Sequence, residues 1–477
     1  MKIGTIVGNR LAPVPVVGHF TECYRNGARQ QRMLRKQAAM SVAEASPPPH
    51  EPQPQPTVES APPEAVADVA APPLPVADWL AARWPAEQPL GCFPAASRGV
   101  RVSVVTDAVD AASLFGGVGT SLVLAALLAN RLGAGLRLVT RTVAPDTGAI
   151  GRVLAANGVC FDGRLEAIHV PHREGHGLPL CDDDFFLTTS WWTTRSLLAT
   201  VHRDRIAYLL QEDERMFYPF GDDRLRCERT LSEPGLLTIV NSRLLFDHLV
   251  AGPDPIPGLA DRADWFEPAF PEAGIRPASP RRSGRRRLFF YARPNHLRNL
   301  FACGIEALSN AVAAGIFHPD EWEIHLVGKH VPDLLFPRGL RPHRVEGLSW
   351  SDYQAFVRTM DAGFVLMDTP HPSYPPLDLA AAGAAVLTNA RGVKRDLSRY
   401  SANIAVAELT PPALQAGLAA LARAACDDEA RAAAVQADGI CRHWERALGP
   451  SVDRIARHFV HDSAPAAREA PAWLRAA

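Results

Sequence analysis

Short apolar segments alternate with longer helical ones from about residue 100 onward. Residues 101–107 (RVSVVTD) are rich in β-branched side chains and short, as is typical of a buried parallel strand. A glycine turn and an apolar helix follow, and then further strand-like segments: LRLVTR, AIHV, DFFLTTS, IAYLLQ and LTIVNS. Strands that alternate with helices in this way predict βαβ units and a parallel sheet.

The alternation stops in a proline-rich stretch at residues 252–280 and a basic run at residues 281–287, and then begins again. The strand-like segments of the second half are LFFYARP, WEIHLVG, AGFVLMD and AAVLTN, and alanine-rich helices follow them. The basic run has no interleaved aromatic residues, so solvated linker charge is favoured over a nucleic-acid site. The chain is therefore predicted to be an α/β protein with two Rossmann-like domains and a cleft between them.

The two ends of the chain differ from this pattern. Residues 46–75 are rich in proline and alanine and are expected to form an extended linker, preceded by a basic segment that acts as a tether or as a solvated appendage. Near the other end, Gly449-Pro450 should break one helix and Ser451 should cap the next. The apolar face of that helix could cross back onto the first domain. The predicted parts are the basic segment with its linker (1–78), the first Rossmann-like domain (79–280), the second Rossmann-like domain (281–440), and the crossover helix with its tail (441–477).

Composition narrows the classes of function. The 477 residues exceed what one hydrophobic core usually serves, and the net charge of -1 gives no global attraction to nucleic acid or an anionic membrane. Eight cysteines without a C-x-x-C pair argue against a zinc site and a disulfide framework. The sequence contains no run of ~18 apolar residues, so no membrane span is expected. We expect a cytoplasmic protein, with peripheral association at the inner face of the membrane through the basic N-terminal segment as an alternative.

A glycine turn and an acidic triplet in the first half resemble known ligand-binding motifs only in part. Gly117-x-Gly119 is followed by Leu122 where a dinucleotide fingerprint requires glycine, so NAD is not expected. The turn at Gly116-Gly117 precedes a helix, whose free N–H groups could bind a phosphate or a sugar hydroxyl. A tight turn without a ligand is the alternative. The triplet at residues 182–184 (DDD) precedes a strand, whereas ligands gather beyond the carboxyl ends of strands. Surface charge, without a metal, is therefore expected there.

Polar and aromatic side chains follow two strands of the first half. Trp191 and Trp192 could supply an apolar platform for a sugar ring, although core packing could explain one of them. Glu212 and Asp213 end the next strand and could orient an acceptor hydroxyl or act as a base. Tyr218 follows in the same loop. An exposed loop without function is the alternative.

The second half carries a more specific pattern. Arg293 and Lys329 follow successive strands, and the turn at Ser373-Tyr374 precedes a helix whose free N–H groups would stabilise phosphate. Asp378 could accept a ribose hydroxyl. Because these groups converge at one edge of a sheet, they predict a site for a nucleoside diphosphate. Arg293 and Lys329 would stabilise its negative charge.

The segments SWWT, YLLQEDERMFYPFG, IVNS, FYARPNHLRNLF, HLVG and HPSYPPLDLAAAG resemble those of retaining GT-B glycosyltransferases of family four, and among them the WsaF-type rhamnosyltransferase group. The resemblance covers about residues 100–403. Family members usually carry a glutamate eight residues before the carboxylate of P-P-L-E. Here Pro370 stands in that position, and Asp378 replaces the second glutamate.

The resemblance implies a GT-B fold and transfer of a sugar from a nucleotide-sugar donor, best matched by dTDP-rhamnose, with retention and without a metal or cofactor. The second domain would bind the donor through Arg293, Lys329, Ser373, Tyr374 and Asp378. The first would bind a glycan or lipid-linked glycan acceptor through Gly116, Gly117, Trp191, Trp192 and Tyr218, with Glu212 and Asp213 among the catalytic candidates. A non-catalytic nucleotide-sugar-binding or scaffolding subunit is the alternative. An NAD-dependent sugar-modifying enzyme is disfavoured by the failed fingerprint.

Overall fold

The structure is a computed structural model that describes residues 73–97, 99–109, 116–172, 176–271 and 284–461. The chain divides into two units, Met1–Pro73 and Leu74–Ala477, and only the second is described below. The expected basic segment and most of the expected linker therefore lie outside the described residues. Among the described helices, none is both long and apolar enough to cross a membrane.

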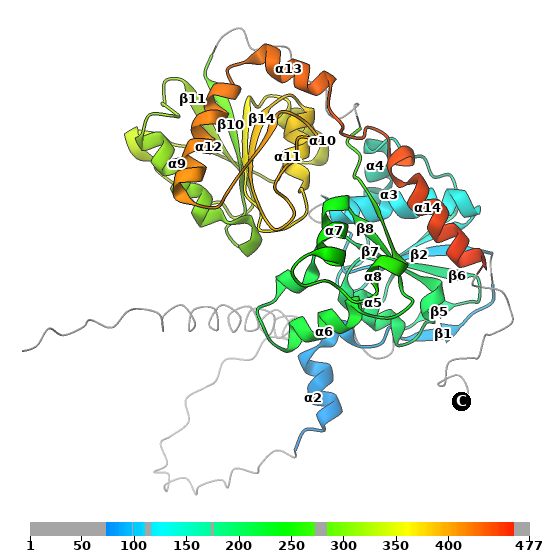
Figure 1. Ribbon diagram of the computed structural model, residues 1–477. Helices are drawn as coiled ribbons and strands as arrows, with labels where there is room; N and C mark the ends of the chain where they lie inside the picture. Colours follow the sequence, from blue (N-terminus) through cyan, green and yellow to red (C-terminus); the bar gives the residue numbers. More distant parts are fainter. Residues whose placement is uncertain (1–72, 98, 110–115, 173–175, 272–283, 462–477) are drawn as a thin grey trace, which may run out of the picture. The chain divides into compact units, whose positions relative to one another are not determined.

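The first sheet has seven strands, all parallel, in the order β4-β3-β2-β6-β7-β8-β9 (Figure 1). The strands are β2 (Arg101–Thr106), β3 (Gly135–Thr140), β4 (Leu165–His169), β6 (Asp184–Thr188), β7 (Ile206–Leu210), β8 (Leu237–Asn241) and β9 (Ala263–Phe266). The six strands expected from the sequence are confirmed. The edge strand β9 lies inside the proline-rich stretch that was expected to interrupt the alternation, so that expectation was wrong there. A separate pair joins β1 (Cys92–Pro94) to β5 (Leu178–Leu180).

Helices cover both faces of this sheet, because successive strand residues alternate between two apolar clusters. Val104 belongs to one cluster and Val105 to the other. The helices are α2 (Val76–Arg83), α3 (Gly117–Leu132), α4 (Thr147–Ala156), α5 (Trp191–Leu198), α6 (Asp222–Leu231), α7 (Arg243–Ala251) and α8 (Leu259–Arg262). Helix α2 spans the expected boundary after residue 78. None of the α2 side chains is buried. The indole of Trp84, which follows α2, donates a hydrogen bond to Asp223 at 2.7 Å, and both residues belong to the expected first domain.

The acidic triplet of the first half is not simply surface charge. Asp184 begins β6 and is fully buried, where its carboxylate forms ion pairs with Arg101 at 2.6 Å and with Arg137 at 3.4 Å. Burial alone would raise the pKa of Asp184, but the hydrogen bond from Arg101 and the charge of Arg137 outweigh it and lower the pKa. The expectation of surface charge was therefore wrong for Asp184, which serves the packing of the sheet.

The second sheet has six parallel strands in the order β12-β11-β10-β13-β14-β15. The strands are β10 (Arg286–Ala292), β11 (Trp322–Gly328), β12 (His343–Glu346), β13 (Ala362–Val365), β14 (Ala385–Asn389) and β15 (Ile404–Ala407). The helices are α9 (Phe301–Ala313), α10 (Trp350–Val357), α11 (Tyr374–Ala381), α12 (Pro411–Ala424) and α13 (Asp428–Gln436). Arg286 and Arg287 belong to β10 and pair with Asp428 and Glu323. These two arginines are therefore strand residues with acidic partners, and not linker charge.

The last helix, α14 (Trp444–His461), returns to the first domain. Pro450 lies inside it and the helix continues past that residue, so the expected break at Gly449-Pro450 was wrong. The side chains of Val452, Ile455 and Phe459 are buried in the cluster that covers one face of the first sheet. The ring of Phe459 stacks on that of Phe185 with centroids 4.4 Å apart. The expected crossover is confirmed.

Candidate functional site

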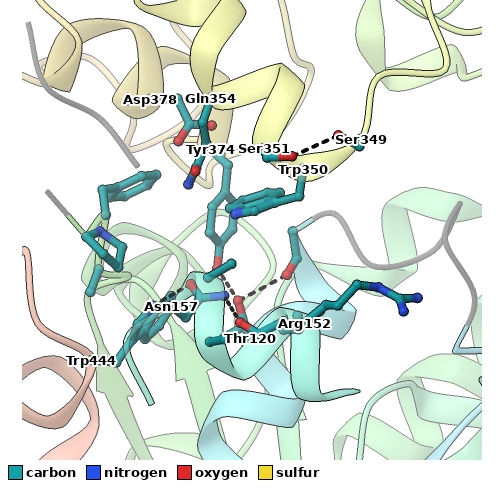
Figure 2. A pocket seen from close by; sticks show the side chains of 18 residues that line it. Thr120, Arg152, Asn157, Ser349, Trp350, Ser351, Gln354, Tyr374, Asp378 and Trp444 are labelled. Carbon is teal, nitrogen blue, oxygen red and sulfur yellow. Dashed lines mark hydrogen bonds between the residues drawn. The ribbon is translucent and has the colours of Figure 1, made fainter. Parts of the chain in front are cut away.

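A cavity of about 420 Å³ lies where α3 and α4 of the first domain meet α10 and α11 of the second (Figure 2). Gly116 and Thr120 line it from the first domain, and Trp350, Tyr374 and Asp378 line it from the second. The glycine turn and the proposed ribose carboxylate thus face the same space. A cavity of this size is within the range of small-molecule sites.

Asp378 supplies an acidic group to the wall of this cavity. Its side chain is largely buried, and the Tyr353 hydroxyl donates a hydrogen bond to it at 3.2 Å. Burial raises the pKa of Asp378 to about 7, although the hydrogen bond from Tyr353 partly offsets the effect. Asp378 was expected in the donor site, and its side chain lines this cavity.

The raised pKa makes a prediction for Asp378→Asn. Between about pH 4 and pH 7 the folded state holds a proton on Asp378 that the unfolded state has released, so the stability of the wild type falls as pH rises through this window. Asp378→Asn has no carboxyl group to titrate at this position, so it lacks this pH-dependent loss of stability. Its melting temperature should therefore exceed that of the wild type by an amount that grows from pH 4 to pH 8.

The matched control for that experiment is Asp320→Asn, because the Asp320 side chain is 88% exposed. Its effect on the melting temperature should not grow with pH in this way. A constant difference between Asp378→Asn and the wild type from pH 4 to pH 8 would contradict the assignment of a raised pKa to Asp378.

Tyr374 joins the two domains. It is the first residue of α11, and its hydroxyl lies 2.6 Å from the Thr120 hydroxyl (Figure 2). The Asn241 amide nitrogen also donates to this hydroxyl, at 2.8 Å. Its ring also lines the cavity. Tyr374 was expected to bind the donor alone, whereas in this structure its hydroxyl also connects the first domain to the second.

Glu212 also contacts both domains. Its carboxylate accepts hydrogen bonds from Arg298 and from the Thr369 hydroxyl, and both of these residues belong to the second domain. Burial raises the pKa of Glu212, although the charge of Arg298 partly offsets the effect. The expected position of Glu212, at the end of a strand in the cleft, is therefore observed. Its partner Arg298 was not singled out in the sequence, although it lies in the same loop as Arg293.

Asp213 has a different environment from its neighbour. Its carboxylate accepts hydrogen bonds from Arg215 at 2.9 Å and lies 3.2 Å from Nε2 of His248. Burial alone would raise the pKa of Asp213, but the contacts with His248 and Arg215 outweigh it and lower the pKa to about 2. A carboxylate with so low a pKa is a weak base, so this geometry favours a structural role over the catalytic one expected for Asp213.

The tryptophan pair is largely packed into the first domain. Trp191 is only 3% exposed, and its indole N–H donates to the Tyr218 hydroxyl at 2.9 Å. The rings of Trp192 and Tyr218 both meet that of Trp191 edge to face. The indole N–H of Trp192 donates to Asp107 at 3.0 Å. The expected sugar platform was therefore wrong for Trp191, whose burial leaves no face for a ligand, while Trp192 and Tyr218 are partly exposed.

The glycine turn is built for close approach. Gly116 has a φ of 68°, which favours glycine, and it precedes α3. The amide nitrogen of Gln211, at the end of β7, donates to the carbonyl of Gly117 at 2.8 Å and would lie 3.0 Å from a Cβ added to that residue. The turn therefore packs on the carboxyl edge of the sheet and lines the cavity at Gly116. Acceptor binding by Gly116 and Gly117 stays a prediction.

Arg293 and Lys329 lie side by side at the carboxyl edge of the second sheet. Ala292 and Gly328 are register partners on β10 and β11, and the Lys329 N–H donates to the Ala292 carbonyl at 3.2 Å. A Cβ on Gly328 would meet that carbonyl oxygen at 1.8 Å, so the close approach requires glycine. Arg293 is half-buried and Lys329 is exposed. The two residues therefore follow adjacent strands at the same edge, and their joint binding of a diphosphate stays a prediction.

Two buried residues near this edge were missed in the sequence. Lys394 is fully buried, and its ammonium donates to the Met367 carbonyl at 3.1 Å. Burial lowers the pKa of Lys394 to about 8. His371 is also buried, in the loop between β13 and α11. Both follow a strand of the second sheet, and the same rule that identified Arg293 could have found them.

A possible metal-ligand group lies elsewhere, on β11 and β12. His325 and His343 are register partners, and with Glu323 their ligand atoms lie within 4.8 Å of one another. Sequence spacing did not predict this group, because the strand pairing forms it. The Glu323 carboxylate already pairs with Arg285 and Arg287 at 3.0 and 3.1 Å. The Glu323 carboxylate is therefore already paired with two guanidinium groups, and we assign no metal to these three residues.

Comparison with known proteins gives a consistent result. The sequence matches the family descriptions "WsaF, N-terminal domain" over residues 101–243 and "WsaF, C-terminal domain" over residues 286–419. Together these matches cover more than half of the chain. The O-antigen biosynthesis protein RfbC of Myxococcus xanthus is 31% identical over 301 residues, which are 61% of this chain and 22% of that protein. The chain thus spans about a fifth of the length of this curated relative.

Solved structures with low sequence identity share the fold. TarM has a TM-score of 0.52 at 8% identity, with 76% of this chain and 99% of that chain covered. WaaG, described as a glycosyltransferase involved in lipopolysaccharide biosynthesis, has a TM-score of 0.49 at 13% identity, with 75% and 99% covered. The likeness to TarM supports the two-domain architecture alone.

Proposed function

The chain belongs to the WsaF family and has the GT-B fold of two parallel-sheet α/β domains, and from this premise we propose that it is a glycosyltransferase. It would transfer a sugar from a nucleotide-diphosphate donor to a bacterial surface glycan. The name of the relative RfbC, an O-antigen biosynthesis protein, supports the assignment to surface glycans.

The observation that carries this proposal is the cavity shared by the two domains. A nucleoside would lie between Trp350 and Asp378, with the Asp378 carboxyl group accepting a ribose hydroxyl. Its diphosphate would extend toward the cations at the ends of β10 and β11. Breaking the bond between sugar and nucleotide leaves negative charge on the diphosphate, and fixed cations in a partly dry site stabilise that charge.

The finer parts of the proposal rest on the resemblance. We infer that the sugar is rhamnose, that dTDP-rhamnose is the donor, and that the anomeric configuration is retained. The acceptor would be a glycan or lipid-linked glycan, bound by the first domain.

A thermal-shift panel of dTDP, UDP, GDP and NAD with the full chain is the first test, followed by turnover of the matching nucleotide sugars. Stabilisation by a nucleoside diphosphate and not by NAD is expected, because ligand binding to the folded state raises the melting temperature. Stabilisation by NAD alone would contradict the proposal.

A non-catalytic nucleotide-sugar-binding subunit is the second candidate. It is favoured because both candidate catalytic acids are already in ion pairs, Glu212 with Arg298 and Asp213 with Arg215. In addition, Pro370 stands where the family usually has a glutamate. Nucleotide binding without turnover, for every donor and glycan acceptor tried, would favour this candidate.

Turnover is expected to survive EDTA. The proposed diphosphate site is lined by Arg293 and Lys329, which can supply the positive charge that a divalent cation provides in other enzymes. Equal initial rates with and without the chelator are the predicted result. A rate that falls on chelation and returns with manganese or magnesium would contradict it.

A further inference from the structure

The N-terminus of α11 lacks most of the backbone donors that a helix usually offers to an anion. The first four N–H groups of a helix have no partner within it. Here two of those four positions are Pro375 and Pro376, which have no N–H, and the Ser373 N–H donates to Nδ1 of His371 at 2.9 Å. The expectation of several free N–H groups at this turn was therefore wrong. A phosphate bound there needs donors from side chains.

Two buried side chains at this turn have unused hydrogen-bonding atoms. His371 and Ser373 are each 4% exposed. Among the described residues, Nε2 of His371 and Oγ of Ser373 have no hydrogen-bond partner. Ser373 does not cap its own helix with this hydroxyl. Buried polar atoms without a partner are rare in folded proteins and suggest that a ligand completes them.

The hydrogen bonds of His371 determine which of its nitrogens can donate. Nδ1 accepts from the Ser373 N–H, so it carries no hydrogen, and the proton of the neutral ring is on Nε2. Burial, with the charges of Lys394 and Arg298, lowers the pKa of His371 to about 3, so the ring is neutral near pH 7. The ring also lies nearly parallel to that of Tyr374, with centroids 6.0 Å apart. His371 therefore presents a fixed, neutral N–H donor.

The charges around this donor suit an anion. Arg298 and Lys394 are the cations that act on His371, and the positive end of the α11 dipole lies at the same place. Glu212 and Asp368 partly balance them, since both act on Lys394. Two hydroxyl or N–H donors beside two cations fit the non-bridging oxygens of a phosphate.

We propose that Nε2 of His371 and the hydroxyl of Ser373 donate hydrogen bonds to the diphosphate of the nucleotide donor, in place of the backbone N–H groups that the two prolines remove. This inference rests on the proposed function, and it adds His371 as a residue that binds the donor. It also explains how a Pro-Pro helix start is compatible with an anion site.

The test compares a diphosphate with its nucleoside. The ligand is the member of the dTDP, UDP and GDP panel that binds the full-length wild type, and the nucleoside is the same compound without phosphate, both measured by calorimetry. His371→Asn keeps an acceptor near Nδ1 and removes the Nε2 donor. It should weaken diphosphate binding about 10-fold or more, while nucleoside binding changes less than about twofold.

Two further variants sharpen this comparison. Ser373→Ala removes one hydroxyl and should weaken diphosphate binding about 3- to 10-fold. His371→Gln places an amide N–H near the position of Nε2 and should recover part of the affinity that His371→Asn loses. Ser373→Ala decides the question if His371→Asn fails to fold.

Matched controls come from buried residues outside the site. Ser451 has a buried hydroxyl without a described partner, and His325 has a buried ring whose Nε2 lies 3.5 Å from the Glu323 carboxylate. Ser451→Ala and His325→Asn should leave both affinities as in the wild type.

Diphosphate affinity unchanged in both His371→Asn and Ser373→Ala would overturn this inference and leave the proposed function standing. Equal loss of nucleoside and diphosphate binding would also overturn it, because it would show a general disturbance of the cavity. A wild type that binds none of the three diphosphates would overturn the proposed function and this inference with it.

Discussion

Arg293→Ala is expected to lower kcat by about 10²–10³ while the protein stays folded, which is the usual effect of removing one group that stabilises developing negative charge. Arg293 is half-buried beside Gly328 at the carboxyl edge of the second sheet, and its guanidinium makes a hydrogen bond of 3.4 Å to the Tyr291 hydroxyl. Because charge on the diphosphate grows in the transition state, kcat should fall more than affinity for the donor. Steady-state kinetics with the matching nucleotide sugar measures both.

Two variants serve as comparisons for Arg293→Ala. Arg293→Lys should recover only part of the rate, because a single ammonium cannot reproduce the bidentate contact of a guanidinium. Lys329→Ala should have the smaller effect of the two alanine variants, since the exposed ammonium of Lys329 is screened by solvent. Wild-type kcat in Arg293→Ala would place the diphosphate elsewhere.

Phe459→Ala is expected to lower the free energy of unfolding by about 3–5 kcal/mol, the usual range for a buried phenylalanine. Phe459 is fully buried and stacks on Phe185 of β6, so the substitution leaves a cavity between α14 and the first sheet. Urea denaturation followed by circular dichroism measures the change.

The adjacent residue provides a control for Phe459→Ala. Val460 is on the same helix and is 60% exposed, so Val460→Ala should change the free energy of unfolding by less than about 0.5 kcal/mol. A similarly small effect for Phe459→Ala would contradict the docking of α14 on the first domain.

The periodicity of the sequence predicted the central strands of both sheets, but not the edge strands β9, β12 and β15. Segments such as RVSVVTD and LFFYARP are short and apolar on both faces, which is typical of parallel strands covered by helices on each side. Short edge strands are harder to recognise. β9 and β12 have four residues each and partly exposed side chains, so neither carries a continuous apolar run.

The candidate site was predictable where it follows strand ends and not where it depends on distant partners. The positions of Arg293, Lys329 and Asp378 followed from the order of strands and helices. The contact between Glu212 and Arg298 joins residues 86 positions apart, and nothing local indicates it. The burial of Asp184 was missed for the same reason, since its partner Arg137 comes from another element. For Trp191, core packing was the alternative left open for one of the two tryptophans, and the structure favours it.

The helix start at Ser373 illustrates a local rule that was available but not applied. Position alone suggested a turn with free N–H groups, while the identities of Pro375 and Pro376 already exclude two of them. The compensating donors, His371 and Ser373, became evident only from their burial and from the bond that determines the tautomer of the imidazole.

Mass spectrometry of a glycan acceptor, incubated with the full chain and a nucleotide sugar that binds it, distinguishes sugar transfer from nucleotide-sugar binding alone. The acceptor should gain the mass of one sugar, with release of one nucleoside diphosphate per transfer, and Arg293→Ala should slow both by about 10²–10³. Binding of the nucleotide sugar without any gain in acceptor mass, across donors and bacterial surface glycans, would contradict the assignment of this protein as a glycosyltransferase.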